Sequence, residues 1–387
     1  MKKTNWLLPA LPKILSYFLV GALAVAITLS VVVSNESKLD ELEKLIDDRF
    51  IGEADLTKLE DAAAKAMLAA TGDRWSYYIP ADQYAAYKEQ KDNAYVGIGI
   101  TIAEREDGTG LNILQVTAGG SAEEAGLRAG DVITAVDGKS IAGMDVDAIR
   151  SMIRGKLGTK VNVTVLRGTE EITASVTRKN IKTPVATARL LSGNVGLITI
   201  ENFNSGCSQQ TIAAVDSLIA QGAQKLIFDV RNNGGGYASE LVKVLDYLLP
   251  EGDLFRTVDY KGREEVSRSD VKHIDLPMAV LVNGSSYSAA EFFAAALMEY
   301  EAAEVVGQQT TGKGYFQVTY ELSDGSAVAL SVGKYFTPKG VSLAGVGITP
   351  DVVVPVDAQT AAKIQAGTLK PMQDPQVLAA IAALNAA

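Results

Sequence analysis

The stretch VLVNGSSYSAAEFFAAAL, residues 280–297, predicts a buried strand, a tight turn and a helix that starts near Ser288. Its β-branched residues end at an Asn-Gly pair, and small residues then continue at helical spacing. A serine at such a junction lies beside backbone N–H groups that the first helical turn leaves free. Further on, TTGKGYFQ, residues 310–317, places Lys313 between two glycines. We take Ser288 as a candidate nucleophile and Lys313 as its candidate base.

Composition limits the classes of protein to which the chain can belong. Its 387 residues have room for two or three domains, and a hydrophobic content of 47% supports a sizeable core. The net charge is −10, and no basic block occurs beyond the N-terminus. Nucleic-acid binding is therefore disfavoured.

Cysteine and histidine are almost absent. The one cysteine, Cys207, excludes an intramolecular disulfide and a cysteine-based metal cluster, and we interpret it as a bystander thiol. The one histidine, His273, rules out a histidine-based zinc site and would have to serve any Ser-His-Asp triad. It lies in a polar stretch, which predicts an exposed loop position, so the base of a hydrolase should be another residue.

The N-terminus predicts a membrane anchor. Lysines precede an uncharged apolar run over residues 14–33, which is long enough to cross a bilayer as a helix. A cleaved signal peptide is the alternative, but small residues at A-x-A spacing are missing before Ser34. We favour an uncleaved signal anchor with a cytoplasmic N-terminus. The rest of the chain would then be extracytoplasmic.

Three helices are predicted next, over residues 38–50, 56–70 and 81–90. The first two are amphipathic, and they could pack on the body of the protein or pair between chains. A β-rich unit follows over residues 94–180, with predicted strands at 111–116 and 132–136, a helix at 144–154 and a closing hairpin around Arg167-Gly168.

The β-rich unit resembles a PDZ domain in its glycine-containing loop, in the segment SAEEAGLRAGD at residues 121–131 and in its hairpin. In that family the loop captures the C-terminal carboxylate of a peptide, which adds as a strand. The resemblance implies that the loop binds peptide through the residues Gly97, Ile98, Gly99 and Ile100. A small β domain with glycine turns and no ligand is the alternative.

Strands and helices alternate from residue 183 onward, which predicts an α/β domain with its chemistry on strand-to-helix turns. We expect strands at 195–200, 225–231 and 278–282, helices at 209–221 and 237–249, a hairpin at 315–322 and 327–335, and a final helix at 377–386.

Two features of this domain suit acyl transfer. The glycines of residues 232–236 precede a helix and leave N–H groups that can bind an oxyanion. The same geometry binds phosphate, and a plain tight turn is a further alternative, but the chain has neither nucleotide-binding glycine motif. Residues 310–317 contain no acid, so burial there would lower the pKa of Lys313 and allow it to act as a base.

Four segments together resemble the carboxy-terminal processing (tail-specific) proteases. They are SAAE after the VLVN strand, GKGYFQ, DVRNNGGG, and YFTPKG followed by GVGITPD. The resemblance covers roughly residues 72–354 and includes the PDZ domain ahead of the protease core. It implies that Ser288 is the nucleophile, Lys313 the base and Gln317 the residue that orients the lysine amine.

The same resemblance implies an oxyanion hole made by the backbone N–H groups of Gly236 and Ala289, with Gly235 as the next candidate. The chain departs from the family pattern in two segments. Gly234 stands where proline is common, and SYSAAE at residues 286–291 stands where SASASE is frequent, so that Tyr287 is bulkier than the usual residue beside the nucleophile. The second departure leaves the shape of the nearby substrate pocket open.

Arg154, at the end of the predicted PDZ helix, could link peptide occupancy to the protease site. The alternative is a solvated cation that is favourable at a helix C-terminus.

The expected fold class is an α/β protease core with an inserted PDZ domain, a single N-terminal transmembrane helix and helical flanking segments. The expected domains are a cytoplasmic stub and anchor (residues 1–34), a helical region (35–93), the PDZ domain (94–180), the protease core (181–358) and a helical segment (359–387).

The expected function is that of a membrane-anchored serine endopeptidase that recognises the C-termini of extracytoplasmic substrates, without a metal or cofactor, and that is gated by its PDZ domain. Its partners would be peptides with free C-termini and the bilayer, and the helical ends are compatible with a homodimer. The alternatives are a silent scaffold that binds protein tails, and acyl or thioester chemistry on a related fold.

Overall fold

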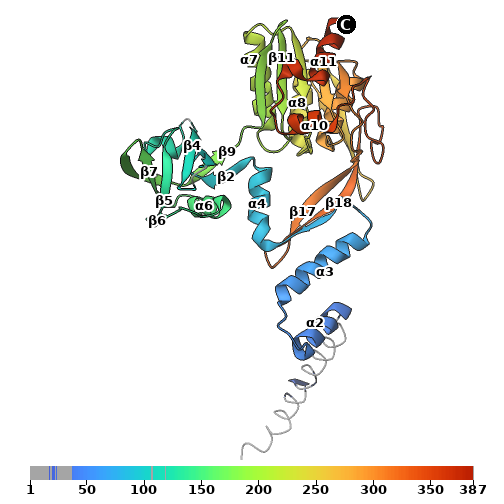
Figure 1. Cartoon of the computed structure of the whole chain (residues 1–387). Helices are drawn as coiled ribbons and strands as arrows, with labels where there is room; N and C mark the ends of the chain where they lie inside the picture. The colour runs from blue at the N-terminus through green and yellow to red at the C-terminus, as the bar shows by residue number, and fades with distance from the viewer. Residues whose placement is uncertain are drawn as a thin grey trace, which may run out of the picture. The chain divides into compact units, whose positions relative to one another are not determined.

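The computed structural model describes Tyr17, Val20, Gly21, Leu23 and residues 37–105, 108–117 and 119–386 (Figure 1). The expected membrane span, residues 14–33, therefore lies outside the described residues except at those first four positions. Within the described part of the chain, no helix is both long enough and apolar enough to cross a membrane. The described residues form two compact units, one up to Tyr78 and the other from Ile79 onward.

The first unit contains two helices, α2 (Lys38–Arg49) and α3 (Leu56–Ala70), as predicted. Ser37 and Asp40 cap the start of α2, because each side chain bonds the backbone N–H of the other residue. Asp55 caps α3 by accepting the N–H of Lys58 at 3.2 Å. Within the described part of the chain neither helix has a buried residue, and apolar side chains such as Leu42 and Met67 are exposed.

The second unit begins with α4 (Ala81–Lys91), which runs into the β-rich unit of residues 94–180. The β-rich unit contains β2 (Ala94–Gly97), β3 (Ile100–Glu104), β4 (Leu111–Val116), α5 (Ser121–Glu124), β5 (Val132–Val136), β6 (Lys139–Ser140), α6 (Val146–Ile153), β7 (Lys160–Arg167), β8 (Glu170–Thr177) and β9 (Lys179–Lys182). Its main sheet has the order β3-β4-β5-β7-β8, and β2 pairs with β9. This unit has a buried apolar core of its own, which includes Ile98, Ile133 and Ile149.

A six-stranded sheet forms the centre of the α/β core. Its elements are β10 (Ala186–Leu191), β11 (Val195–Ile200), α7 (Cys207–Ala220), β12 (Lys225–Asp229), α8 (Ala238–Leu248), β15 (Met278–Val282), α9 (Ala289–Glu299), β16 (Ala303–Gly307) and β19 (Val352–Val353). The order is β10-β11-β12-β15-β16-β19, and every neighbouring pair is parallel except β10 with β11. The α/β prediction is confirmed.

Both faces of this sheet are covered, which explains why its strands are apolar without interruption. Along β12, Leu226 and Phe228 belong to the core that includes α7, α8 and α9, whereas Ile227 between them packs on the opposite face. That opposite face is covered by α11 (Pro375–Ala386), through residues such as Val377 and Leu384. Alternate residues of a strand thus enter two separate cores.

A second, antiparallel sheet contains β13 (Gly252–Asp259), β14 (Glu264–Ser269), β17 (Tyr315–Glu321) and β18 (Ala327–Phe336). The pair β17–β18 matches the predicted hairpin. The pair β13–β14 is absent from the prediction, because its sequence is rich in charged residues that are typical of a loop. Several of these charges are paired across the hairpin, for example Arg256 with Glu264 and Asp253 with Arg268. The remaining elements are β1 (Tyr77–Ile79), α10 (Ala358–Gln365) and the short helix η1 (Pro371–Gln373).

Candidate active site

Ser288 lies at the junction between β15 and α9, where the sequence predicts it. It is 6% exposed, and α9 begins with the next residue. Its backbone has φ 59° and ψ −127°, a positive φ that non-glycine residues rarely adopt. Such strain persists only where surrounding contacts hold it, and it is frequent at functional sites.

The other serines of this turn have different surroundings. The hydroxyl of Ser286 is fully buried and donates to the carbonyl of Val230 at 2.7 Å, so it ties two turns together. Ser285 is exposed. Of these three serines, Ser288 therefore has the most constrained backbone, and its hydroxyl is not used to bridge the two turns.

Glu291 is the residue that connects Ser288 to Lys313. Its carboxylate is fully buried, and Oε2 accepts the backbone N–H groups of Ser288 and Lys313, each at 2.9 Å. Oε1 accepts the hydroxyl of Thr310 at 2.6 Å and the N–H of Gly312 at 2.7 Å. One carboxylate thus fixes the start of α9 and the loop of residues 310–313 to each other.

In the sequence, Glu291 is recognisable only as the last residue of the SAAE motif at residues 288–291. Its place three residues after Ser288 is the spacing of a helix-capping glutamate, and this signal could have indicated the bond to the N–H of Ser288. The bonds to Thr310, Gly312 and Lys313 could not be inferred, because they come from a loop about twenty residues away.

Lys313 is half-buried in the loop that leads into β17. Its amine nitrogen lies 5.9 Å from the centroid of the Tyr287 ring. The glycine before it is required, because Gly312 has φ 83° and a Cβ there would lie 2.8 Å from the backbone nitrogen of Val346. The loop is thus held by close backbone packing as well as by Glu291.

Gln317 lies near the start of β17, opposite an irregularity in the pairing with β18. Its side-chain nitrogen donates to the hydroxyl of Ser331 at 2.9 Å and to the carbonyl of Tyr315 at 3.2 Å. These contacts fix the amide on the antiparallel sheet. Its predicted role toward the amine of Lys313 stays a prediction.

The glycine-rich turn packs directly on the nucleophile junction. A Cβ on Gly235 would lie 2.7 Å from the Cβ of Ser288 and 2.9 Å from the nitrogen of Ala289. The N–H of Gly235 donates to the side chain of Asn233 at 2.8 Å, so it is already used.

Gly236 is the better placed of the two candidate donors in this turn. Phe203 bonds to both neighbours of Gly236, by donating to the carbonyl of Gly235 and accepting from the N–H of Tyr237. In such a bridge the N–H of the central residue points away from the pairing strand. This geometry favours Gly236 over Gly235.

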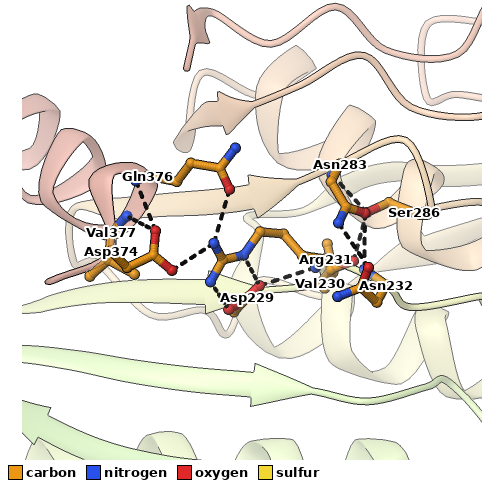
Figure 2. A network of polar contacts seen from close by, with 9 residues as sticks. All are labelled: Asp229, Val230, Arg231, Asn232, Asn283, Ser286, Asp374, Gln376 and Val377. Carbon is orange, nitrogen blue, oxygen red and sulfur yellow. Dashed lines mark hydrogen bonds and ion pairs between the residues drawn. The ribbon is translucent and has the colours of Figure 1, made fainter. Parts of the chain in front are cut away.

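A polar network joins the two turns (Figure 2). Asn232 and Asn283 bond each other twice, since the side chain of Asn283 accepts the N–H of Asn232 at 3.0 Å and donates to its side-chain oxygen at 2.9 Å. Ser286 adds the bond to Val230 described above. These bonds therefore hold the ends of β12 and β15 together just before the glycines of residues 234–236 and just before Ser288.

Arg231 extends this network to the C-terminal segment (Figure 2). Its buried guanidinium pairs with Asp229 at 2.6 Å and with Asp374 at 2.8 Å, and it donates to Gln376 at 2.9 Å. Because each charge is paired inside the protein, loss of one partner would leave a buried charge uncompensated. Residues 374–376 thus help to hold the turn that carries the glycines.

A groove on the β-rich unit contains all four predicted peptide-binding residues, Gly97, Ile98, Gly99 and Ile100, and it is also lined by Arg150, Ile153 and Arg154 of the α6 region. Gly99 has φ 78° and its carbonyl accepts the N–H of Thr117 at 2.9 Å. The predicted loop and helix therefore meet at one groove. Arg154 ends α6, and its guanidinium carbon lies 4.9 Å from the centroid of the Tyr95 ring.

The two residues that sequence analysis sets aside are both unsuited to catalysis where they lie. His273 is exposed in a loop. Cys207 is fully buried at the start of α7, and burial raises the pKa of its thiol to about 12. Over the described residues, no three His, Cys, Asp or Glu side chains come together in a way that could hold a metal ion.

Cys207 is expected to resist alkylation in the folded protein. A thiol with a pKa of about 12 has almost no thiolate at neutral pH, and its side chain is 0% exposed. Iodoacetamide at pH 7.5 should leave Cys207 unmodified by mass spectrometry, whereas the same reagent in 6 M guanidinium chloride should modify it fully. Rapid labelling of the native protein would contradict the bystander interpretation.

Known proteins resemble this chain in both the α/β core and the β-rich unit. The sequence matches peptidase family S41 over residues 194–354 and a PDZ domain over residues 113–167. It is 34% identical over 325 residues to the carboxy-terminal processing protease CtpA of Bacillus subtilis, which corresponds to 82% of this chain and 69% of that protein.

A probable CtpA-like serine protease of Staphylococcus aureus is also 34% identical, over 326 residues, which correspond to 83% of this chain and 65% of that protein. The match thus spans slightly less than two thirds of the staphylococcal relative. Among solved structures, the photosystem II D1 C-terminal processing protease is similar with 31% identity and a TM-score of 0.47, over 82% of this chain and 88% of that one.

Proposed function

The chain belongs to the carboxy-terminal processing proteases of peptidase family S41, and from this membership we propose that it is a serine endopeptidase that recognises its substrates by their C-termini. The observation that carries the proposal is the carboxylate of Glu291, which binds the backbone of both Ser288 and Lys313. A buried serine and a half-buried lysine held by one acceptor suit a nucleophile and its base.

In the proposed reaction, neutral Lys313 takes the proton of the Ser288 hydroxyl as its oxygen attacks the scissile carbonyl. The protonated lysine then gives a proton to the leaving amine, and water hydrolyses the acyl-enzyme. Gln317 would orient the lysine amine through its side-chain amide. Its bond to Ser331 holds that amide on a rigid strand pair, which supports such a role.

The N–H groups of Gly236 and Ala289 would stabilise the tetrahedral oxyanion. Three observations support this assignment: the packing of Gly235 on Ser288, the engagement of the Gly235 N–H by Asn233, and the position of Ala289 at the first turn of α9. Donors at a helix N-terminus that are fixed before the reaction stabilise developing negative charge most effectively.

The groove on the β-rich unit would bind the C-terminal carboxylate of the substrate at the loop of residues 97–100. Occupancy of that groove would gate the protease site, and Arg154 would take part because it lines the groove at the end of α6.

Residues 14–33 would anchor the protein in the cell membrane, with the N-terminus cytoplasmic and the catalytic region extracytoplasmic. The exposed apolar side chains of α2 and α3, such as Leu42 and Met67, would suit a homodimer.

A peptide with a free C-terminal carboxylate is expected to be cleaved at least about tenfold more efficiently, as kcat/KM, than the same peptide with an amidated C-terminus, because loss of a charge-assisted contact weakens binding. The measurement compares both peptides with the full-length chain, and a fluorophosphonate probe reports labelling of the active serine. A protein that binds the free-acid peptide but neither cleaves it nor takes the probe would be a silent scaffold, and the proposal would fail.

A further inference from the structure

Tyr287, one of the two departures from the family pattern, lies against the other. The phenol packs on the backbone of Gly234, where a Cβ would lie 2.5 Å from the hydroxyl oxygen and 2.8 Å from the ring carbon that carries it. The N–H of Tyr287 also donates to the carbonyl of Asn233 at 3.1 Å. The tyrosine is thus attached to the glycine-rich turn by both its backbone and its ring.

The absence of a side chain at Gly234 leaves the space that this ring occupies. The φ of Gly234 is not positive, unlike those of Gly235 and Gly236, so its backbone conformation would accept other residues. What a side chain at this position would meet is the phenol of Tyr287. The two unusual residues are therefore a matched pair, in which the missing side chain at 234 makes room for the ring at 287.

The ring that rests on Gly234 also faces the candidate base. The amine nitrogen of Lys313 lies 5.9 Å from the ring centroid of Tyr287, within the range over which an aromatic face attracts an ammonium group. Through Tyr287, the oxyanion turn and the lysine loop contact a single side chain next to the nucleophile.

We propose that Tyr287 is a positioning residue for Lys313. The ring of Tyr287 packs on Gly234 and stabilises the ammonium form of the lysine. The inference rests on the proposed function for its catalytic meaning. In the reaction, that form follows proton transfer from Ser288 and precedes proton donation to the leaving amine, so the ring would favour the charged intermediate. The cost is that the free enzyme would need a higher pH to provide a neutral lysine.

Other ionisable residues also contact this loop, among them Tyr335, whose backbone N–H donates to the carbonyl of Gly314 at 2.9 Å. The carboxylate of Glu291 accepts the backbone N–H of Lys313, and Lys334 of β18 is the register partner of Tyr315. Residues 343–347, on which Gly312 and Gly314 pack, include no ionisable side chain. All of these groups are unchanged by substitution of Tyr287, so a shift on its substitution reports the ring.

The test compares Tyr287→Leu with Tyr287→Phe in the full-length chain. Leucine keeps an apolar side chain but removes the aromatic face, so the rising limb of kcat/KM against pH should move to lower pH by about 0.5 unit. Phenylalanine keeps the face and should keep the wild-type midpoint. Gly234→Ala displaces the phenol, so it should move the limb in the same direction, and it should add nothing to Tyr287→Leu because the two changes remove one interaction.

A direct titration separates this inference from the proposed function. In Ser288→Ala protein labelled with carbon-13 at the lysine ε position, NMR follows the Lys313 amine, which Lys313→Arg identifies. A lower pKa in Tyr287→Leu supports the inference even if the chain cleaves no peptide. Identical titration curves for the two proteins would overturn it, even if Ser288 and Lys313 prove to be catalytic. A merely structural role for Tyr287 would change stability and leave the curve in place.

Discussion

Ser288→Ala is expected to lower kcat for a tailed peptide by a factor on the order of 10³ or more, since removal of a nucleophile leaves only the contribution of binding and the oxyanion donors. Lys313→Ala should lose a similar factor. The double substitution should lose little beyond either single one, because the two residues act in one proton transfer. Initial-rate kinetics of the three variants on one peptide measure this.

The controls for this prediction come from the same segments. Ser285→Ala removes an exposed hydroxyl three residues before Ser288 and should cleave at the wild-type rate. Lys313→Arg keeps the positive charge but cannot lose its proton at working pH, so it should be as inactive as Lys313→Ala. An active arginine variant would mean that the charge of Lys313 matters and its basicity does not, and the proposed mechanism would then be wrong.

The sequence predicted the α/β core well because its signals are local. An uninterrupted apolar strand such as residues 278–282 is expected to be buried on both faces. In the structure its side chains alternate between the two cores that cover the sheet. The helix start at Ser288 followed from small residues after a turn, and it is found one residue later. The presence of a single histidine, in a polar stretch, already favoured a lysine as the base.

Contacts between distant segments were not predictable in this way. No local pattern shows that the carboxylate of Glu291 accepts an N–H from Lys313, or that Arg231 pairs with Asp374 across 143 residues. The charged hairpin of β13 and β14 was missed because the ion pairs between the two strands form only when the strands meet. Gly234 and Tyr287 are two separate departures in the sequence, and only their side-by-side packing joins them.

Glu291→Ala is expected to have the second largest effect on activity, although Glu291 takes no part in proton transfer. The substitution leaves four donors without their acceptor in a fully buried site. Each unsatisfied buried donor costs about 1–3 kcal/mol, so unfolding free energy should fall by about 4 kcal/mol or more. Because the same bonds align Ser288 with Lys313, kcat should fall by a factor on the order of 10².

Glu291→Gln should be milder, and the geometry predicts why. The amide oxygen can remain at the Oε2 position, where it still accepts the N–H groups of Ser288 and Lys313. The NH₂ group then lies at the Oε1 position, where the hydroxyl of Thr310 can turn to accept but the N–H of Gly312 cannot. Two donors then lack Oε1, the N–H of Gly312 and the hydroxyl of Thr310, against four donors in the alanine variant. We therefore expect a stability loss of about 2–6 kcal/mol, at about 1–3 kcal/mol for each unsatisfied donor, with most of the alignment kept.

Urea unfolding followed by circular dichroism, together with kcat on one peptide, distinguishes these two variants. Glu299→Gln is the matched control, because Glu299 ends the same helix and accepts a single backbone N–H, that of Lys339, at 2.8 Å. It should change kcat little. If glutamine proved as damaging as alanine, the negative charge of Glu291 would matter more than its acceptor geometry. If alanine left kcat unchanged, the alignment of Ser288 and Lys313 would not depend on the shared carboxylate. The bonds of Glu291 to these two residues would then no longer support the proposed function.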